Sequence, residues 1–188
     1  MDYNEYNFAT SVLFDGAENK INEITTDTRD EIFNWILEEF KDKPLRVYQV
    51  GAIETFRFGW RVGSGWSDMI FGPHIRDNGG KLTVVDVSVD NLAKTLLAAK
   101  SIGYDVQMIC GDALDFMDYD TEPYDVYYLD GSNDPRETLK QFNKIKDNKC
   151  IVIVDDFSIK GTLLQDYNFV VKNVANKVGI LDMRDKNE

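Results

Sequence analysis

The chain has 188 residues, 43% of them hydrophobic, which allows one globular domain with a sizeable core and excludes disorder as the default. Its net charge of −12 repels phosphate backbones, and no run of residues is rich in lysine and arginine, so we expect no nucleic-acid partner. No apolar stretch approaches the length of a membrane span, and the N-terminus is unlike a signal peptide. We therefore expect a cytoplasmic protein without a membrane partner.

The helical pattern begins at Thr28. Apolar residues from there to Phe40 form a broad face, and Pro44 ends the helix because proline cannot continue it. We predict one domain over residues 1–188, with an N-terminal helical segment (1–43) and a Rossmann-like core (44–183).

Short β-rich runs then alternate with helical segments. The runs are 46–50, 81–85, 105–109, 124–129 and 151–154, and the clearest helices are 90–101 and 135–146. Runs that are apolar on both faces and alternate with helices predict a parallel sheet covered on both sides. Four of the five runs end at or near an acidic residue, and ligands of such sheets bind beyond the carboxyl ends of the strands.

The tail follows a different pattern. Two β-rich runs, 168–173 and 177–183, are too close in sequence for a helix to fit between them, so they must pair as an antiparallel hairpin. The predicted fold is a Rossmann-like three-layer α/β/α sandwich, whose mostly parallel seven-stranded sheet ends in a C-terminal antiparallel hairpin.

The two cysteines, Cys110 and Cys150, each lie beside an apolar run. Such thiols are more typical of a reduced core than of a disulfide. We expect both to be free and buried.

A long glycine-containing loop follows the first run, from Gly51 to Ser67. Gly51 allows a tight turn, and Gly63 and Gly65 allow the backbone to approach a ligand closely. Glycine-rich turns without ligands are also common, so the loop alone leaves a purely structural role open. Its length favours a functional role.

Acidic residues follow the second and third runs. Asp86 ends the second run, about 20 residues past the glycines, where an acidic side chain accepts hydrogen bonds from ribose hydroxyls. A solvated aspartate is the alternative. Gly111, Asp112 and Ala113 follow the third run, where Asp112 either accepts from an adenine amino group or caps a helix.

Three aspartates follow the fourth and fifth runs: Asp130, Asp155 and Asp156. Carboxylates that converge in one cleft repel each other unless a cation lies between them, and oxygen ligands suit Mg²⁺ or Ca²⁺. The alternative is that Asp130 contacts cofactor or solvent while Asp155 and Asp156 begin a loop.

Over about residues 44–183, these features resemble the class I S-adenosylmethionine-dependent methyltransferases. The resemblance rests on Val47-Tyr-Gln-Val-Gly51, Asp86, Gly111-Asp112-Ala113, Tyr124-Asp-Val-Tyr-Tyr-Leu-Asp-Gly131 and the closing hairpin. Within that class, Leu129-Asp-Gly131 with Ile153-Val-Asp-Asp-Phe157 looks like the catechol-type, cation-dependent O-methyltransferases.

The resemblance implies S-adenosylmethionine as cofactor, O-methylation of a small molecule, and a Mg²⁺ ion or another divalent cation held by Asp130, Asp155 and Asp156. It makes Asp130 and Asp155 catalytic. The implied cofactor-binding residues are Gly51, Ile53, Gly63, Ser64, Gly65, Trp66, Ser67, Asp86, Val87, Gly111, Asp112, Ala113 and Asp130.

Two departures from that family stand out. The compact acidic glycine motif is replaced by Gln49-Val-Gly51, an insert, and then Gly63-Ser-Gly65, and the family's lysine soon after the fourth-strand aspartate is missing. The general base is therefore unassigned. The alternatives are a non-catalytic methyltransferase-like partner subunit and a nicotinamide-dependent dehydrogenase, and a homo-oligomer is compatible with the sequence.

Overall fold

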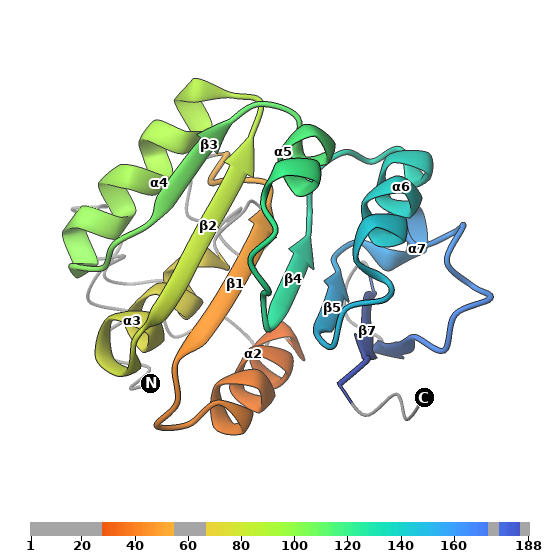
Figure 1. Cartoon of the computed structure of the whole chain (residues 1–188), viewed down its shortest axis with the longest axis horizontal. Helices are drawn as coiled ribbons and strands as arrows, with labels where there is room; N and C mark the ends of the chain where they lie inside the picture. Colours follow the sequence, from red (N-terminus) through yellow and green to blue (C-terminus); the bar gives the residue numbers. More distant parts are fainter. Residues whose placement is uncertain (1–27, 55–66, 173–176, 185–188) are drawn as a thin grey trace, which may run out of the picture.

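The computed structural model describes residues 28–54, 67–172 and 177–184. Within these ranges the chain forms one seven-stranded sheet in the order β3-β2-β1-β4-β5-β7-β6 (Figure 1). The strands are β1 (Leu45–Val50), β2 (Gly80–Asp86), β3 (Gln107–Cys110), β4 (Val126–Leu129), β5 (Ile151–Val154), β6 (Val170–Lys172) and β7 (Val178–Asp182). The first five strands pair in parallel, as the alternation of β-rich runs and helices predicted.

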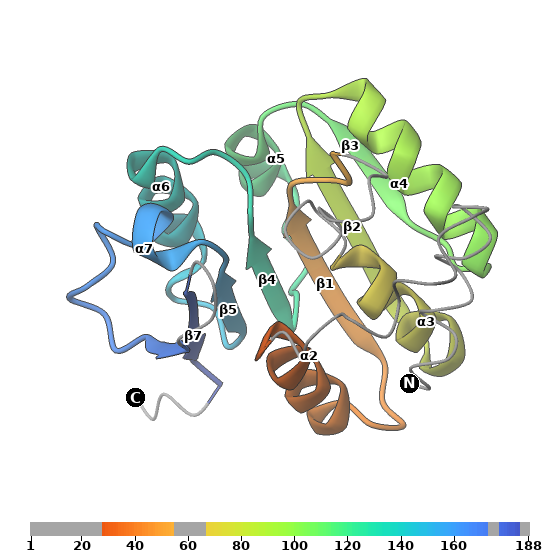
Figure 2. The ribbon, with the colours of Figure 1, turned by 180° about the vertical axis from the view of Figure 1, so that it is seen from behind.

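Helices cover both faces of this sheet. They are α2 (Thr28–Glu39), α3 (Asp68–Asn78), α4 (Val89–Ile102), α5 (Ala113–Tyr119), α6 (Pro135–Ile145) and α7 (Phe157–Lys160). Figures 1 and 2 show α2, α3 and α4 on one face and α5 and α6 on the other, with the short α7 beside α6. The predicted three-layer arrangement is confirmed.

The strands are buried on both faces because successive side chains point to opposite sides of the sheet. In β5, Ile151 and Ile153 belong to the core cluster under α2 and α3, whereas Val152 and Val154 belong to the cluster under α5 and α6. All four side chains are fully buried. A strand of this kind reads in sequence as a continuous apolar run.

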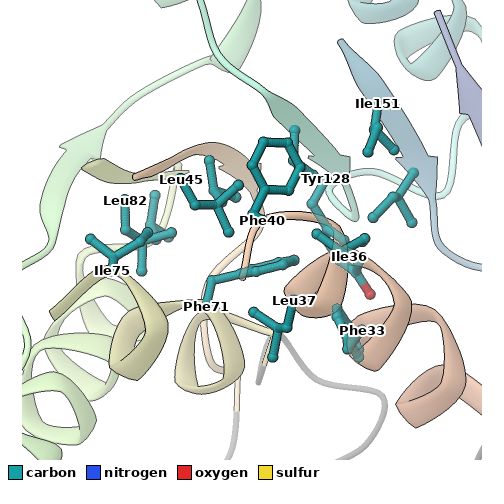
Figure 3. Packing of buried hydrophobic residues seen from close by; sticks show 14 of the residues in the cluster. Phe33, Ile36, Leu37, Phe40, Leu45, Phe71, Ile75, Leu82, Tyr128 and Ile151 are labelled. Carbon is teal, nitrogen blue, oxygen red and sulfur yellow. The ribbon is translucent and has the colours of Figure 1, made fainter. Parts of the chain in front are cut away.

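Aromatic rings pack α2 against the sheet (Figure 3). The ring of Phe33 lies edge-on to Phe71 of α3 at 5.4 Å and stacks on Tyr128 of β4 at 5.8 Å, centroid to centroid. Phe71 is fully buried. The helix predicted from Thr28 onward thus packs against the centre of the sheet through its aromatic face.

The C-terminal hairpin is antiparallel, as predicted, with β7 placed between β5 and β6. Both cysteines are free, but only Cys150 is buried. Cys110 is exposed because it ends β3, the strand at the edge of the sheet, so the prediction that it lies in the core was wrong. None of the helices in the described ranges is long and apolar enough to span a membrane.

Candidate functional site

A cleft of about 800 Å³ opens at the carboxyl ends of the strands, where β1 lies beside β4. The chain leaves β1 toward helices on one face and β4 toward helices on the other, which makes this the topological switch point of the sheet and the usual place for a ligand. The cleft is lined by Val50, Gly51, Ala52, Glu54, Val85, Asp86, Val87, Ser88, Asn91, Gly111, Asp112, Ala113, Asp130, Gly131, Ser132, Asn133, Glu137, Gln141, Asp156 and Lys160.

Gly51 lines the cleft directly after the end of β1. Its φ of 97° lies in the left-handed region, and a Cβ atom there would sit 2.5 Å from the carbonyl oxygen of Asp130. The backbone N–H of Asp130 donates to the carbonyl of Val50 at 3.0 Å, so β1 and β4 stay paired up to this point. Only glycine permits both the turn and this close approach.

The buried side chain of Gln49 connects the two ends of the segment between Gly51 and Ser67. Its Nε2 donates to the carbonyl of Gly51 at 2.9 Å, and its Oε1 accepts from the hydroxyl of Ser67 at 2.9 Å. An amide can donate and accept at once, whereas an ionised carboxylate only accepts. This gives a physical reason for glutamine at the position where the methyltransferase motif has an acid.

Asp86 fixes the backbone on two sides of the cleft. Its Oδ2 accepts from the N–H of Ala52 at 2.9 Å and its Oδ1 from the N–H of Ser88 at 2.7 Å. An ionised carboxylate has about four lone-pair sites, so these bonds leave it able to accept further bonds from a ligand. Asp86 is therefore anchored by the backbone rather than simply solvated.

Asp112 caps α5, which was one of the two roles that the sequence left open. Its Oδ1 accepts from the N–H of Leu114 at 2.9 Å. Its neighbours Gly111 and Ala113 line the cleft beside it, as does Asp112 itself. The cap fixes the position of this carboxylate at the end of β3.

A buried lysine forms ion pairs with two of the aspartates that follow β4 and β5. The Nζ atom of Lys160 lies 2.5 Å from Asp130 Oδ1 and 3.6 Å from Asp156 Oδ2, and its side chain is only 3% exposed. Asp156 has a φ of 47°, a left-handed conformation that aspartate tolerates better than most residues. This turn starts α7 directly after β5, and Lys160 lies at the far end of that helix.

The charges of this buried group depend on one another. Burial, and next the carboxylate of Asp155, raise the pKa of Asp130, and the ammonium of Lys160 opposes them. Burial by itself would lower the pKa of Lys160, but the carboxylate of Asp130 outweighs that effect and the pKa is raised. Lys160 is therefore held as an ammonium ion.

Asp155 lies beneath the cleft rather than on it. It is buried, its Oδ2 accepts from the hydroxyl of Tyr128 at 2.8 Å, and its Oδ1 accepts from the N–H of Asp156 at 2.8 Å. No group of three or more potential metal ligands occurs among the described residues. The predicted divalent-cation site at Asp130, Asp155 and Asp156 is not supported, because the ammonium of Lys160 lies between two of these carboxylates and hydrogen-bond donors hold the third.

The structure brings together most of the predicted site residues that it describes. On the cleft lie Gly51, Asp86, Val87, Gly111, Asp112, Ala113, Asp130 and Asp156. Ile53 and Ser67 are instead buried and do not line it. Gly63, Ser64, Gly65 and Trp66 fall outside the described residues. The sequence reasoning missed Lys160, whose only signal was a position shortly after the Asp155-Asp156 pair.

No protein-family profile matches the sequence, and no curated protein matches it. Solved structures do match. The methyltransferase PaMTH1 of Podospora anserina, with SAH bound, is 14% identical, with 97% of this chain and 87% of that chain covered and a TM-score of 0.63. Cofactor-bound Rv0187 from MTB is 13% identical, with 97% and 91% covered and a TM-score of 0.63. The O-methyltransferase from Bacillus cereus in complex with SAH is 11% identical, with 97% and 92% covered and a TM-score of 0.61. The chain therefore has the Rossmann-like fold of the S-adenosylmethionine-dependent methyltransferases.

Proposed function

We propose that this protein is an S-adenosylmethionine-dependent methyltransferase that methylates an oxygen atom of a small molecule. The observation that carries the proposal is the cleft at the β1–β4 switch point, where the tight turn at Gly51 faces carboxylates at the ends of neighbouring strands. Its volume of about 800 Å³ falls within the range of small-molecule pockets, roughly 300–1,000 Å³. Three solved methyltransferase or cofactor-bound structures with this fold support the same choice.

The charge of the cleft favours this cofactor over a dinucleotide. Six acidic residues and one basic residue, Lys160, line it. S-adenosylmethionine carries a sulfonium cation, an ammonium group and one carboxylate, so its net charge is positive and such a surface attracts it, whereas the pyrophosphate of a nicotinamide dinucleotide is repelled. The dehydrogenase alternative is therefore disfavoured by electrostatics as well as by the antiparallel hairpin.

The carboxylates at the ends of β2 and β3 match the hydrogen-bond donors of the cofactor. Asp86 accepts from the ribose hydroxyls, and Asp112, fixed by its helix cap, accepts from the adenine amino group, with Ala113 against the ring. When bound, S-adenosylmethionine supplies a methyl group on a sulfonium centre. Asp130 lines the same cleft.

The role of the cleft in the reaction is to hold the acceptor in line with the methyl–sulfur bond. Transfer breaks that bond, forms a methyl–oxygen bond and leaves S-adenosylhomocysteine, while the hydroxyl proton of the acceptor passes to solvent water. Holding both reactants at attack distance accounts for a large part of the rate enhancement in such transfers. Magnesium has no part in this proposal, because Lys160 lies where a cation would bind.

The test is isothermal titration calorimetry with S-adenosylmethionine and S-adenosylhomocysteine, each with Mg²⁺ and with EDTA. We expect micromolar binding of both ligands under both conditions, and no binding of NADH. Asp86→Ala should weaken binding at least tenfold, whereas Asp105→Ala, at an exposed position away from the cleft, should not. Absence of binding by the folded wild type would contradict the proposal and favour a non-catalytic partner domain.

If the cofactor binds, a screen of hydroxyl-bearing small molecules identifies the acceptor through release of S-adenosylhomocysteine. Phenols, sugars and hydroxylated metabolites are the classes to include. The cleft's acidic lining makes a neutral or cationic acceptor the expected choice over a phosphorylated one.

A further inference from the structure

The aspartates after β4 and β5 form a group that requires a positive charge. β4 and β5 are neighbours in the sheet, so Asp130 and the pair Asp155-Asp156 lie at the same edge. Asp155 is 2% exposed, and the side chain of Asp130 is 10% exposed. Like charges this deeply buried cannot all ionise unless a cation compensates them.

Lys160 is placed to be that cation. Its Nζ is 2.5 Å from Asp130 Oδ1 and 3.6 Å from Asp156 Oδ2, so it bridges the ends of the two strands. The side chain is almost completely buried, yet Lys160 also lines the cleft. An ammonium ion with three donors can bind several carboxylate oxygens at once, as a metal ion does.

A divalent cation could not join this arrangement without displacing Lys160. Mg²⁺ requires oxygen ligands at about 2.0–2.1 Å in nearly octahedral geometry. Asp155 is held in place by hydrogen bonds to both of its oxygens, from Tyr128 and from the backbone of Asp156. Oδ1 of Asp130 accepts from the ammonium of Lys160.

We propose that Lys160 is the built-in cation of this site: its ammonium takes the place of a divalent metal between Asp130 and Asp156, holds the Asp130 carboxylate at the cleft and makes the site metal-independent. The use of this cation in methyl transfer rests on the proposed function, whereas its replacement of a metal does not. Lys160 is a positioning residue here, since it acts through Asp130.

The proposal predicts that removing the ammonium creates a metal site. Mn²⁺ is titrated by calorimetry into the wild type, Lys160→Met and Lys172→Met. Lys172 lies on exposed β6 away from the cleft, so Lys172→Met controls for the loss of one positive charge. We expect Lys160→Met to bind one Mn²⁺ at least tenfold more tightly than the wild type or Lys172→Met, and Mn²⁺ to raise its melting temperature.

The double variant Lys160→Met/Asp130→Asn locates the new site. It should lose the Mn²⁺ affinity that the single variant gains, because one of the carboxylates is gone. A folded Lys160→Met that binds Mn²⁺ no more tightly than the wild type would overturn the proposal, since the carboxylates would then not form a cation site.

The wild type provides a second, independent test if Lys160→Met does not fold. The proposal requires that the wild type bind Mn²⁺ only as weakly as Lys172→Met. Tight binding of one Mn²⁺ by the wild type, lost in Asp130→Asn, would overturn it. Titration with S-adenosylmethionine on the same samples separates this outcome from failure of the proposed function, because neither Mn²⁺ measurement requires the cofactor.

Discussion

At the scale of single residues, Asp68 is a carboxyl group buried at the start of α3. It is fully buried, and its Oδ1 accepts from the N–H of Met69 at 2.9 Å. Burial raises the pKa of Asp68 to about 8, although this hydrogen bond opposes the shift. In the unfolded chain the same group titrates near 4. The folded state therefore keeps a proton that the unfolded state loses between these two values.

The linkage between proton binding and folding fixes the direction in which stability changes with pH. The contribution of Asp68 to stability is complete below about pH 4 and declines as the pH rises to about 8, by at most about 1.4 kcal/mol per pH unit. Asp68→Asn should flatten this decline, so that its stability relative to wild type improves by more than about 1 kcal/mol between about pH 5 and about pH 7.5. Urea unfolding of both proteins at the two pH values measures this change in relative stability.

Asp77→Asn is the matched control for this measurement. Asp77 is exposed, and the hydrogen bond from Arg76 lowers its pKa, so Asp77 is ionised in both states between about pH 5 and about pH 7.5, and Asp77→Asn should leave the pH dependence in this window unchanged. If Asp68→Asn and wild type keep the same difference in stability at both pH values, Asp68 is ionised in the folded protein and the assignment fails.

At the scale of elements, β1 and α3 are connected by the side chain of Gln49, which binds both the carbonyl of Gly51 and the hydroxyl of Ser67. Gln49→Leu keeps the side chain's bulk and removes both bonds. We expect a loss of about 1–3 kcal/mol in unfolding free energy, since buried polar groups lose their partners. Because Gly51 lines the cleft, affinity for S-adenosylmethionine should also fall, by about tenfold.

Thr83→Val separates these two effects. Thr83 is buried in β2, where its hydroxyl pairs with the hydroxyl of Tyr124 at 2.9 Å, and it does not line the cleft. Thr83→Val should lower the unfolding free energy, measured by urea unfolding, with little change in cofactor affinity, measured by calorimetry. Equal affinity in Gln49→Leu and wild type would mean that the two hydrogen bonds of Gln49 contribute to stability but not to cofactor binding.

The elements of this fold could be predicted because their patterns are local. The run 151–154 is apolar at every position and became β5, buried on both faces. The hairpin followed from two β-rich runs too close together for a helix. The run predicted at 105–109 became β3 at Gln107–Cys110, a strand with exposed residues, because its place at the edge of the sheet depends on tertiary order.

The candidate site was harder to predict because its contacts are not local. The carboxylates at the ends of β2, β3 and β4 followed from strand order, since parallel strands bring their carboxyl ends together. Lys160 could not be found in this way. In sequence it is an ordinary lysine after a short apolar stretch. Its burial depends on tertiary structure, because the left-handed turn at Asp156 and the position of α7 near the end of β4 bring its Nζ to Asp130.

At the scale of the whole molecule, the acidic character of the chain extends into the cleft. The chain carries a net charge of −12, and six of the acidic residues line the cleft against one lysine. Such a cleft attracts a cationic ligand over distances comparable to the Debye length, which is about 30 Å at 0.01 M ionic strength and about 3 Å at 1 M. Cofactor binding should therefore weaken with salt.

S-adenosylhomocysteine is the natural control, because it lacks only the methyl group and the sulfonium charge. Raising the ionic strength from about 0.01 M to about 1 M should weaken S-adenosylmethionine binding several-fold more than S-adenosylhomocysteine binding, as measured by calorimetry. Glu54→Gln, at the cleft, should reduce this difference, whereas Glu31→Gln, on α2, should not. The same salt dependence for both ligands would mean that the acidic lining does not act on the sulfonium centre, and that the selectivity of the cleft comes from its shape and hydrogen bonds instead.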